Sequence, residues 1–262
     1  METVQQGGWD PSVYERFAAE RSRPFEDLLA LVQRRPGMRV ADLGCGSGAL
    51  TRRLHDALSA EATLGIDSSA EMLGRSAKHA GNGVAFLRGD LAEFAPERPL
   101  DLVFSNAALH WAPDHPSLFE RLSRLLAPGG QLAVQVPDQE THASHATARD
   151  VAREEPFASR LPGGARVSPV LVPEAYASLL FRLGFREQTV RLQIYGHPLE
   201  SREDVVEWVK GTLLTDYKKR LGPELYTSFL ARYRERLMER LPDERPFFYP
   251  YRRILMWGRL GR

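Results

Sequence analysis

Short apolar runs alternate, in the first half of the chain, with longer segments whose apolar residues recur every three or four positions. The short runs predict strands at residues 39–43, 62–67, 84–88, 100–105 and 131–136. The periodic segments predict helices at residues 49–60, 69–80 and 116–126. This alternation is typical of a mostly parallel, doubly wound sheet with helices on both faces.

The flanking segments add helices and two more strands. Residues 10–35 predict a helix that breaks at Arg23-Pro24, and Gly222-Pro223 separates two further predicted helices. The remaining pattern predicts a helix at 174–183, a strand at 186–195, helices over 201–241 and a last strand at 253–258. We therefore expect a seven-stranded α/β fold with an antiparallel last strand and helical insertions that act as a lid.

The chain shows no linker or internal repeat, so we expect one domain over residues 1–262. Its predicted parts are an N-terminal helical lid (1–36), a ligand-binding core (37–137), a helical and loop cover (138–185), and edge strands (186–262) that carry a helical cap (201–241).

Composition excludes several classes of protein. The chain is 43% hydrophobic and 26% charged, with a formal net charge of +1, so neither disorder nor a polyanionic partner is expected. A single cysteine, Cys45, excludes a disulfide framework and a cysteine-built zinc site. No window resembles a signal peptide or a membrane helix. We expect a soluble, cytoplasmic monomer without nucleic-acid or membrane partners.

The even total charge conceals a gradient along the chain. Residues 1–150 carry 15 basic and 20 acidic side chains, whereas residues 216–262 carry 12 and 6. The C-terminal excess has two interpretations: a solvated, arginine-rich helix or a basic cap for an anionic ligand.

The strongest chemical signal is a glycine-rich turn after the first predicted strand. Asp42 ends that strand, and Gly44, Gly46 and Gly48 follow it before a helix. The spacing is G-x-G-x-G, which differs from the G-x-G-x-x-G of dinucleotide enzymes, and an acidic residue there suits an ammonium group better than a pyrophosphate. Asp67 ends the second strand, where a carboxylate can accept hydrogen bonds from ribose hydroxyls.

These elements, with Gly89-Asp90-Leu91 after the third strand, resemble the class I S-adenosylmethionine-dependent methyltransferases, which have a Rossmann-like fold. The resemblance implies that S-adenosyl-L-methionine is the cofactor and that residues 37–137 bind it. Asp42 would hold the methionine end, Asp67 the ribose and Asp90 the adenine edge. The other implied cofactor residues are Tyr14, Arg21, Gly44, Cys45, Gly46, Ser68, Met72, Leu91 and Asn106. Met72 also fits an ordinary core methionine, and Cys45 fits a small loop residue better than a nucleophile.

A narrower resemblance covers most of the chain. The segments at 9–24, 106–115 and 206–211 resemble the trans-aconitate 2-methyltransferase family, whose bacterial members form monomethyl esters of small polycarboxylates. The segment at 246–253 is more aromatic and basic than the resemblance predicts, which leaves the acceptor open.

Methyl transfer to a carboxylate needs little proton chemistry, because the acceptor is already ionised at neutral pH. We therefore expect no essential general base, although His110 could serve as one for an alcohol or amine acceptor. Arg252 and Arg253 are neighbours in a predicted strand, so at most one points inward. The candidate acceptor-binding residues are Trp9, Tyr14, Arg23, His110, Trp111, Tyr249, Tyr251 and Arg252. No histidine spacing predicts a metal site.

The leading hypothesis is an S-adenosylmethionine-dependent carboxyl O-methyltransferase that esterifies a small di- or tricarboxylate such as trans-aconitate. The alternative is the same chemistry on a carrier-bound acyl carboxylate or on a specialised-metabolite hydroxyl. A nicotinamide-dependent oxidoreductase is disfavoured by the glycine spacing, and a catalytically silent binding module by the complete Asp42, glycine and Asp67 set.

Overall fold

The structure of this protein, a computed structural model, describes residues 18–91, 93–165 and 167–261, with side chains from Ser22 onward. The chain divides into two compact units. The sheet unit contains Ser22–Pro137, Pro169–Gln193 and the last segment from Arg252, and the helical unit contains Asp138–Ser168 and Ile194–Tyr251.

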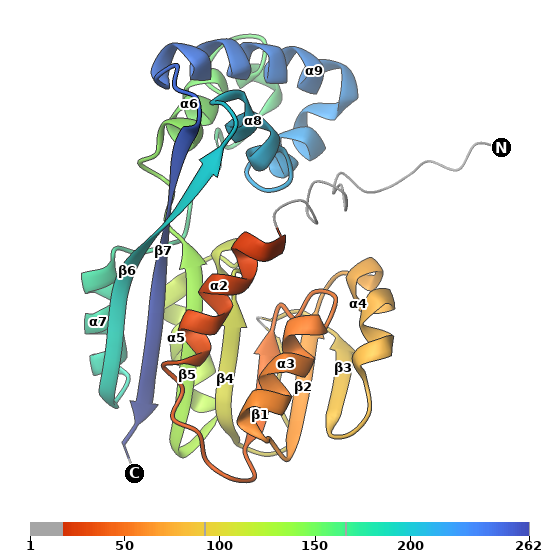
Figure 1. Ribbon diagram of the computed structural model, residues 1–262, viewed down its shortest axis with the longest axis vertical. Helices are drawn as coiled ribbons and strands as arrows, with labels where there is room; N and C mark the ends of the chain where they lie inside the picture. Colours follow the sequence, from red (N-terminus) through yellow and green to blue (C-terminus); the bar gives the residue numbers. More distant parts are fainter. Residues whose placement is uncertain (1–17, 92, 166, 262) are drawn as a thin grey trace, which may run out of the picture. The chain divides into compact units, whose positions relative to one another are not determined.

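One seven-stranded sheet is drawn in Figure 1, with the strand order β3-β2-β1-β4-β5-β7-β6. The strands are β1 (Arg39–Leu43), β2 (Ala62–Asp67), β3 (Val84–Arg88), β4 (Leu100–Asn106), β5 (Leu126–Pro137), β6 (Phe185–Leu199) and β7 (Phe247–Leu260). The strands β1 to β5 pair in parallel, and β7 pairs antiparallel to β5. The predicted mostly parallel sheet with an antiparallel last strand is confirmed.

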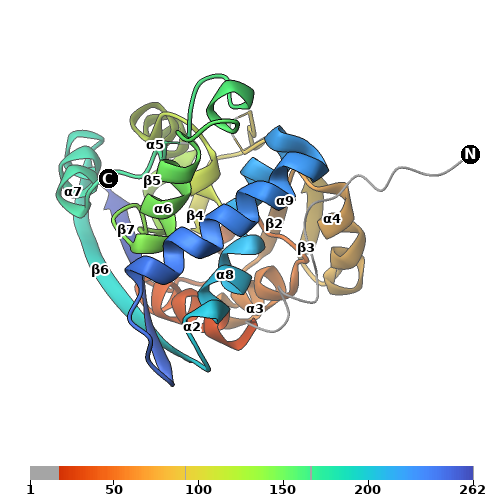
Figure 2. The same ribbon diagram turned by 90° about the horizontal axis from the view of Figure 1, so that it is seen from above.

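The helices of the sheet unit cover both faces of its strands. They are α2 (Ala18–Leu29), α3 (Ala49–Leu58), α4 (Ala70–Ser76), α5 (His115–Arg124) and α7 (Pro173–Arg182), with short 3-10 turns η1 (Ala77–His79) and η2 (Leu109–Trp111). Seen from above, α2 and α3 lie on one face, and α5 and α7 on the other (Figure 2). This is the doubly wound arrangement that the alternation of strands and helices predicts.

Each face of the sheet has its own apolar core. On the first face the ring of Phe25 in α2 meets that of Phe104 in β4 edge-on, with centroids 5.4 Å apart. On the second face Phe119 of α5 and Tyr176 of α7 pack together, 5.3 Å between centroids, in a cluster that includes Val103 and Val134. The strands are therefore apolar on both sides, which explains their nearly continuous hydrophobic runs.

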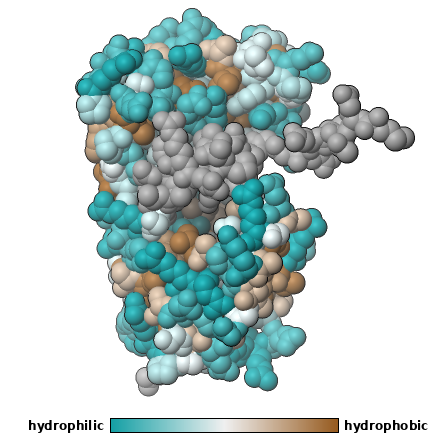
Figure 3. Space-filling model, turned by 45° about the vertical axis from the view of Figure 1, so that its right-hand side comes forward, coloured by the Kyte–Doolittle hydropathy of each residue, from teal (hydrophilic) through white to brown (hydrophobic). Residues whose placement is uncertain are grey.

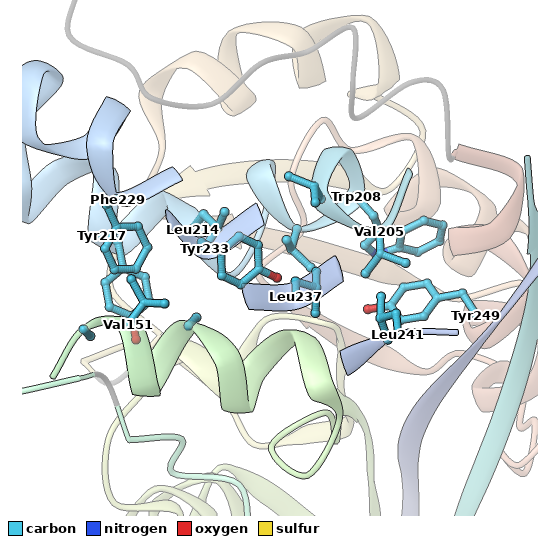
Figure 4. Packing of buried hydrophobic residues seen from close by; sticks show 14 of the residues in the cluster. Val151, Val205, Trp208, Leu214, Tyr217, Phe229, Tyr233, Leu237, Leu241 and Tyr249 are labelled. Carbon is cyan, nitrogen blue, oxygen red and sulfur yellow. The ribbon is translucent and has the colours of Figure 1, made fainter. Parts of the chain in front are cut away.

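The helical unit contains α6 (Ala143–Val151), η3 (Ala158–Arg160), α8 (Glu203–Lys210) and α9 (Leu214–Arg240). Its core contains many aromatic residues, several of which are labelled in Figure 4. Tyr217 stacks on Phe229 at 4.9 Å, and Trp208 meets Tyr249 edge-on at 5.6 Å.

Two sequence predictions need correction. The helix α2 continues through Pro24 instead of breaking there, because Phe25 and Leu28 are buried against the sheet and keep the following turn helical. The strand predicted at 131–136 begins at Leu126 instead, so Pro128-Gly129-Gly130 lies inside β5, and the pairing of β5 with β4 shifts register around it.

The strands β6 and β7 are longer than predicted, and their arrows run in opposite directions in Figure 1, as an edge hairpin requires. Gly222 has φ 74° and ψ 169°, so α9 is two helices that meet at the predicted break. The helix α7 packs in the core of the sheet unit.

Hydrophilic side chains dominate the face drawn in Figure 3, with apolar ones scattered among them. Within the described residues, no helix is long and apolar enough to cross a membrane.

Candidate active site

The carboxyl ends of β1, β2 and β4 meet through direct hydrogen bonds. The backbone N–H groups of Gly44 and Cys45 both donate to the carbonyl of Ile66, at 2.8 and 3.0 Å. The hydroxyl of Ser105 donates to the carbonyl of Leu43 at 2.7 Å. The glycine turn is thereby fixed between its two neighbouring strands, at the edge where open α/β sheets bind ligands.

Two glycines of this turn have positive φ angles and close neighbours. Gly44 has φ 78°, and a Cβ placed on it would lie 2.1 Å from the Cβ of Ala108 after β4. Gly46 has φ 56°, and its Cβ would lie 3.0 Å from the Cε of Met72. At Gly44 only glycine combines this backbone with this close approach, whereas the neighbour of Gly46 is the flexible end of a methionine. Met72 accordingly packs against the glycine turn.

The carboxylate of Asp42 is buried under the turn, with 4% of the residue exposed. The hydroxyl of Thr51, in α3, donates to it at 2.6 Å. Burial raises the pKa of Asp42 to about 6, and the negative charge of Asp67 adds to this effect, while the Thr51 hydrogen bond opposes it. At neutral pH the group is mostly ionised and suits a cationic ligand.

Asp67 joins the glycine turn to the start of α4. One carboxylate oxygen accepts from the N–H of Gly46, and the other from the N–H of Ser69, each at 2.9 Å. The hydroxyl of Ser69 in turn caps α4 by accepting from the N–H of Met72 at 3.2 Å. The residues predicted for ribose and adenine therefore form one connected group.

The thiol of Cys45 is buried beside these acids. Burial raises its pKa far above the ordinary value, and the charges of Asp42 and Asp67 raise it further. The thiol therefore stays protonated at neutral pH, which agrees with the interpretation of Cys45 as a small loop residue.

The remaining predicted cofactor residues end neighbouring strands. The N–H of Gly89 donates to the carbonyl of Asp67 at 3.1 Å, which brings Asp90 and Leu91 to the same edge of the sheet. Asn106 is half-buried, and its Oδ1 is buried without a hydrogen-bond partner in the described part of the chain. Ser68 is exposed beside them.

The predicted acceptor residues are more dispersed. Arg23 lies exposed on α2, and the rings of His110 and Trp111 lie 5.0 Å apart in η2, with Trp111 48% exposed. Arg252 is half-buried at the start of the last sheet-unit segment. Tyr249 and Tyr251 are buried in the aromatic core of the helical unit. Trp9, Tyr14 and the side chain of Arg21 lie outside the described residues.

Sequence reasoning missed Thr51 and Gln135 at this edge, and it left open which of Arg252 and Arg253 points inward. Thr51 holds Asp42, and a hydroxyl residue in the helix after the turn was the signal for it. Gln135 and Arg253 are buried side by side on β5 and β7, where Arg253 Nη1 donates to Gln135 Oε1 at 3.2 Å. Only the pairing register brings these two together. Within the described residues, no group of three or more histidine, cysteine or acidic residues could hold a metal ion.

Comparison with known proteins now decides the family. A family model described as a methyltransferase domain matches residues 40–130. The chain is 42% identical over 253 residues to a trans-aconitate 2-methyltransferase of Deinococcus radiodurans, which covers 94% of this chain and 96% of the relative. A trans-aconitate 2-methyltransferase of Methylobacterium nodulans is 41% identical and covers 97% and 99%. The chain belongs to the trans-aconitate 2-methyltransferase family.

Solved structures agree on the fold of this family member. The YcgJ protein of Bacillus subtilis superposes with a TM-score of 0.59 at 15% identity, covering 92% of this chain and 99% of that one. A phosphoethanolamine N-methyltransferase of Haemonchus contortus, solved with S-adenosylhomocysteine, has a TM-score of 0.55 at 16% identity and covers 92% and 53%. The chain is an S-adenosylmethionine-dependent methyltransferase with the class I fold.

The residues present fit S-adenosylmethionine, the cofactor of this family. Gly44 and Gly46 leave a surface that a Cβ would fill. Asp42 offers a buried negative charge to an ammonium group, and Asn106 offers a buried oxygen without a partner among the described residues. Carboxylate and amide oxygens are the acceptors that an amino-acid cation requires.

Proposed function

We propose that this enzyme transfers the methyl group of S-adenosylmethionine to one carboxylate of trans-aconitate and forms a monomethyl ester. The observation that carries the proposal is the 42% identity to a trans-aconitate 2-methyltransferase over 94% of the chain. The complete Asp42, glycine and Asp67 group supports it, because a catalytically silent relative would have no need to keep that arrangement.

In this proposal the chain's own residues bind and orient the cofactor. Asp42 and the turn at Gly44 to Gly46 hold the ammonium end, and Asp67 accepts hydrogen bonds from the ribose. Asn106 lies beside the reacting centre. Ser68, Met72, Asp90 and Leu91 surround the adenine, while Tyr14, Arg21 and Cys45 remain predicted contacts.

The cofactor, when bound, supplies an electrophilic methyl group on a positively charged sulfur. The acceptor carboxylate is ionised at neutral pH, so the chain needs to align it, exclude water and neutralise the carboxylates that do not react. No side chain has to remove a proton in this reaction. His110 and Trp111 lie four and five residues after Asn106 in the chain, and we propose that they, with Arg23, bind the acceptor. Arg252 remains a prediction, as an alternative to its neighbour Arg253. Trp9, Tyr14, Tyr249 and Tyr251 remain predictions for the same role.

A methyl-acceptor screen tests the proposed function. The purified enzyme is incubated with S-adenosylmethionine and one acceptor at a time, and products are identified by mass. We expect a gain of one methyl group on trans-aconitate and none on hydroxyl acceptors. Turnover of a carrier-bound acyl carboxylate or of a hydroxyl, without turnover of trans-aconitate, would favour the alternative acceptor and reject this one.

We also propose that the enzyme works as a cytoplasmic monomer without nucleic-acid or membrane partners, on the support of its even total charge and single cysteine. Light scattering of the purified protein at micromolar concentration should give the mass of one 29.5 kDa chain.

A further inference from the structure

Two glutamines on β5 are both fully buried but have different hydrogen-bonding states. Both polar atoms of the Gln131 side-chain amide are hydrogen-bonded. Its Oε1 accepts from the N–H of Gln33 at 2.8 Å and from Trp257 Nε1 at 2.9 Å. Its Nε2 donates to the carbonyl of Gln33 at 2.8 Å. Gln135 accepts from Arg253 through Oε1, but its Nε2 is buried with no hydrogen-bond partner among the described residues. Buried donors without partners are rare and costly. Gln131 is therefore a structural residue, whereas Gln135 has a donor available for a ligand.

The sheet register places Gln135 and Arg253 in one row with the cofactor residues. Asp42 pairs with Phe104, Asn106 pairs with Gln135, and Pro137 pairs with Arg253. Directly paired residues share a face, and side chains alternate along a strand. Asp42, Asn106, Gln135 and Arg253 thus lie on one face of β1, β4, β5 and β7, at the carboxyl end of the parallel strands.

The chemistry of this pair matches a carboxylate. Arg253 is only 5% exposed, and a guanidinium held by an amide in the protein interior presents several N–H donors in a fixed plane. A carboxylate accepts two such hydrogen bonds side by side, and the buried Nε2 of Gln135 adds another donor. The neighbouring Arg252 is on the opposite side of the strand by alternation.

We propose that Arg253 and Gln135 bind a carboxylate of the acceptor, a role that rests on the proposed function. The sheet order separates β7 from β1 by three strand spacings, which is about 14 Å at roughly 4.8 Å each. The amino-acid end of the cofactor is proposed at β1 and β4, so a carboxylate at β7 belongs to a second molecule. The pair neutralises a carboxylate that is not methylated and fixes the orientation of the acceptor.

Gln135→Glu is the sharpest test, because it keeps the size of the side chain and supplies a permanent carboxylate to Arg253. The acceptor KM should rise about 10- to 100-fold, as expected when charged hydrogen bonds are lost, while the S-adenosylhomocysteine Kd and the melting temperature stay near wild type. A merely structural pair would keep its acceptor KM in this variant.

Arg253→Gln and Arg253→Lys extend the test, with Arg259→Gln on the same face of β7 and Gln131→Glu as matched controls. Arg253→Gln should raise the acceptor KM as much as Gln135→Glu does, Arg253→Lys should raise it less, and the controls should leave it unchanged. An unchanged acceptor KM in both Gln135→Glu and Arg253→Gln would reject the proposal. A selective loss of S-adenosylhomocysteine binding, with normal binding of methylthioadenosine, would also reject the proposal. That result would assign the pair to the carboxylate of the cofactor.

Titration of wild-type enzyme with a panel of trans-aconitate, citrate and tricarballylate, in the presence of S-adenosylhomocysteine, separates this proposal from the proposed function. If another carboxylate of the panel binds and trans-aconitate does not, only the proposed acceptor fails, and the variants are then compared with that carboxylate. If no carboxylate binds, both proposals fail.

Discussion

The sheet unit and the helical unit bury polar groups in different ways. In the sheet unit, Asp42, Gln135 and Arg253 are buried along one edge of the strands, where they can bind a ligand. In the helical unit the arginines lie nearer the surface and pair with local acids, as in Arg232 with Glu154 at 2.7 Å and Arg240 with Asp150 at 2.7 Å. The C-terminal basic excess is thus largely a solvated, ion-paired helix, and this difference favours that interpretation over a basic cap.

A substitution at the glycine turn should have the largest effect on the sheet unit's function. We expect Gly44→Ala to lower kcat/KM by at least about 1,000-fold, because the new Cβ would lie 2.1 Å from that of Ala108 on a backbone with φ 78°. Steady-state kinetics with the methyl-acceptor assay measures this.

Gly74→Ala is the matched control, since no atom lies within 4 Å of a Cβ placed there in α4. It should keep full activity and gain up to about 1 kcal/mol of stability. Normal activity in Gly44→Ala would show that the turn can relax and that its geometry does not determine binding.

Removal of an aromatic ring from the helical unit tests whether both units unfold together. Phe229 is fully buried and meets Phe157 at 5.2 Å and Tyr217 at 4.9 Å. Phe229→Ala should cost about 3–5 kcal/mol of unfolding free energy. If residues 1–262 form one domain, calorimetry should show a single transition at a temperature lower by roughly 10 °C.

Phe181→Ala, at an exposed position of α7, should leave the transition unchanged. Two transitions, of which Phe229→Ala shifts only one, would contradict the prediction of a single domain and make the units separate folding domains.

Asp67→Ala should weaken cofactor binding about 100-fold while the protein stays folded. The substitution removes both the proposed ribose contact and the link between Gly46 and Ser69. Titration with S-adenosylhomocysteine measures the Kd, and Asp56→Ala on the exposed side of α3 is the control. An unchanged Kd in Asp67→Ala would refute the ribose assignment.

The two units also differ in how far sequence predicts them. The glycine turn and the strand-end acids are local motifs, so Asp42, Gly44 and Asp67 could be predicted and lie together. The pair Gln135 and Arg253 is 118 residues apart in sequence, and only the antiparallel register joins it. Tyr249 lies in an aromatic core assembled from several helices, and no local periodicity distinguishes such a core residue from a ligand contact.

The buried Asp42 should make cofactor binding depend on pH. Its pKa is about 6 in the protein, and an ammonium ligand favours the ionised form. The S-adenosylhomocysteine Kd should therefore rise as the pH falls below about 6, approaching tenfold per pH unit. Asp42→Asn should bind weakly at every pH, without this dependence. A wild-type Kd that is constant between pH 5 and 7 would contradict the assignment.

The raised pKa of Asp42 also makes the stability of the cofactor-free protein depend on pH, but with the opposite sign: cofactor binding strengthens as the pH rises, whereas stability falls. Between the ordinary pKa of 3.8 and the raised value of about 6, the folded protein retains a proton that the unfolded chain has released. The unfolding free energy of the cofactor-free protein should therefore fall as the pH rises through this window, by up to about 3 kcal/mol. The difference between wild type and Asp42→Asn in denaturant titrations at pH 4 and pH 7 isolates this contribution.

The smallest effect is expected at a tyrosine of the helical unit. The hydroxyl of Tyr233 is buried without a hydrogen-bond partner in the part of the chain that the structure describes, and burial raises the pKa of this phenol well above its ordinary value. Tyr233→Phe removes a hydroxyl that is desolvated in the folded protein and has no hydrogen-bond partner among the described residues. The unfolding free energy should therefore stay equal or rise by about 1 kcal/mol. Denaturant titration measures the change, with Tyr176→Phe in the sheet unit as the contrast. The Tyr176 hydroxyl accepts from the N–H of Leu171 at 3.2 Å and contacts His115, so that variant should lose stability. A loss of more than about 1 kcal/mol in Tyr233→Phe would mean that its hydroxyl is satisfied and that both units pair their buried polar groups equally well.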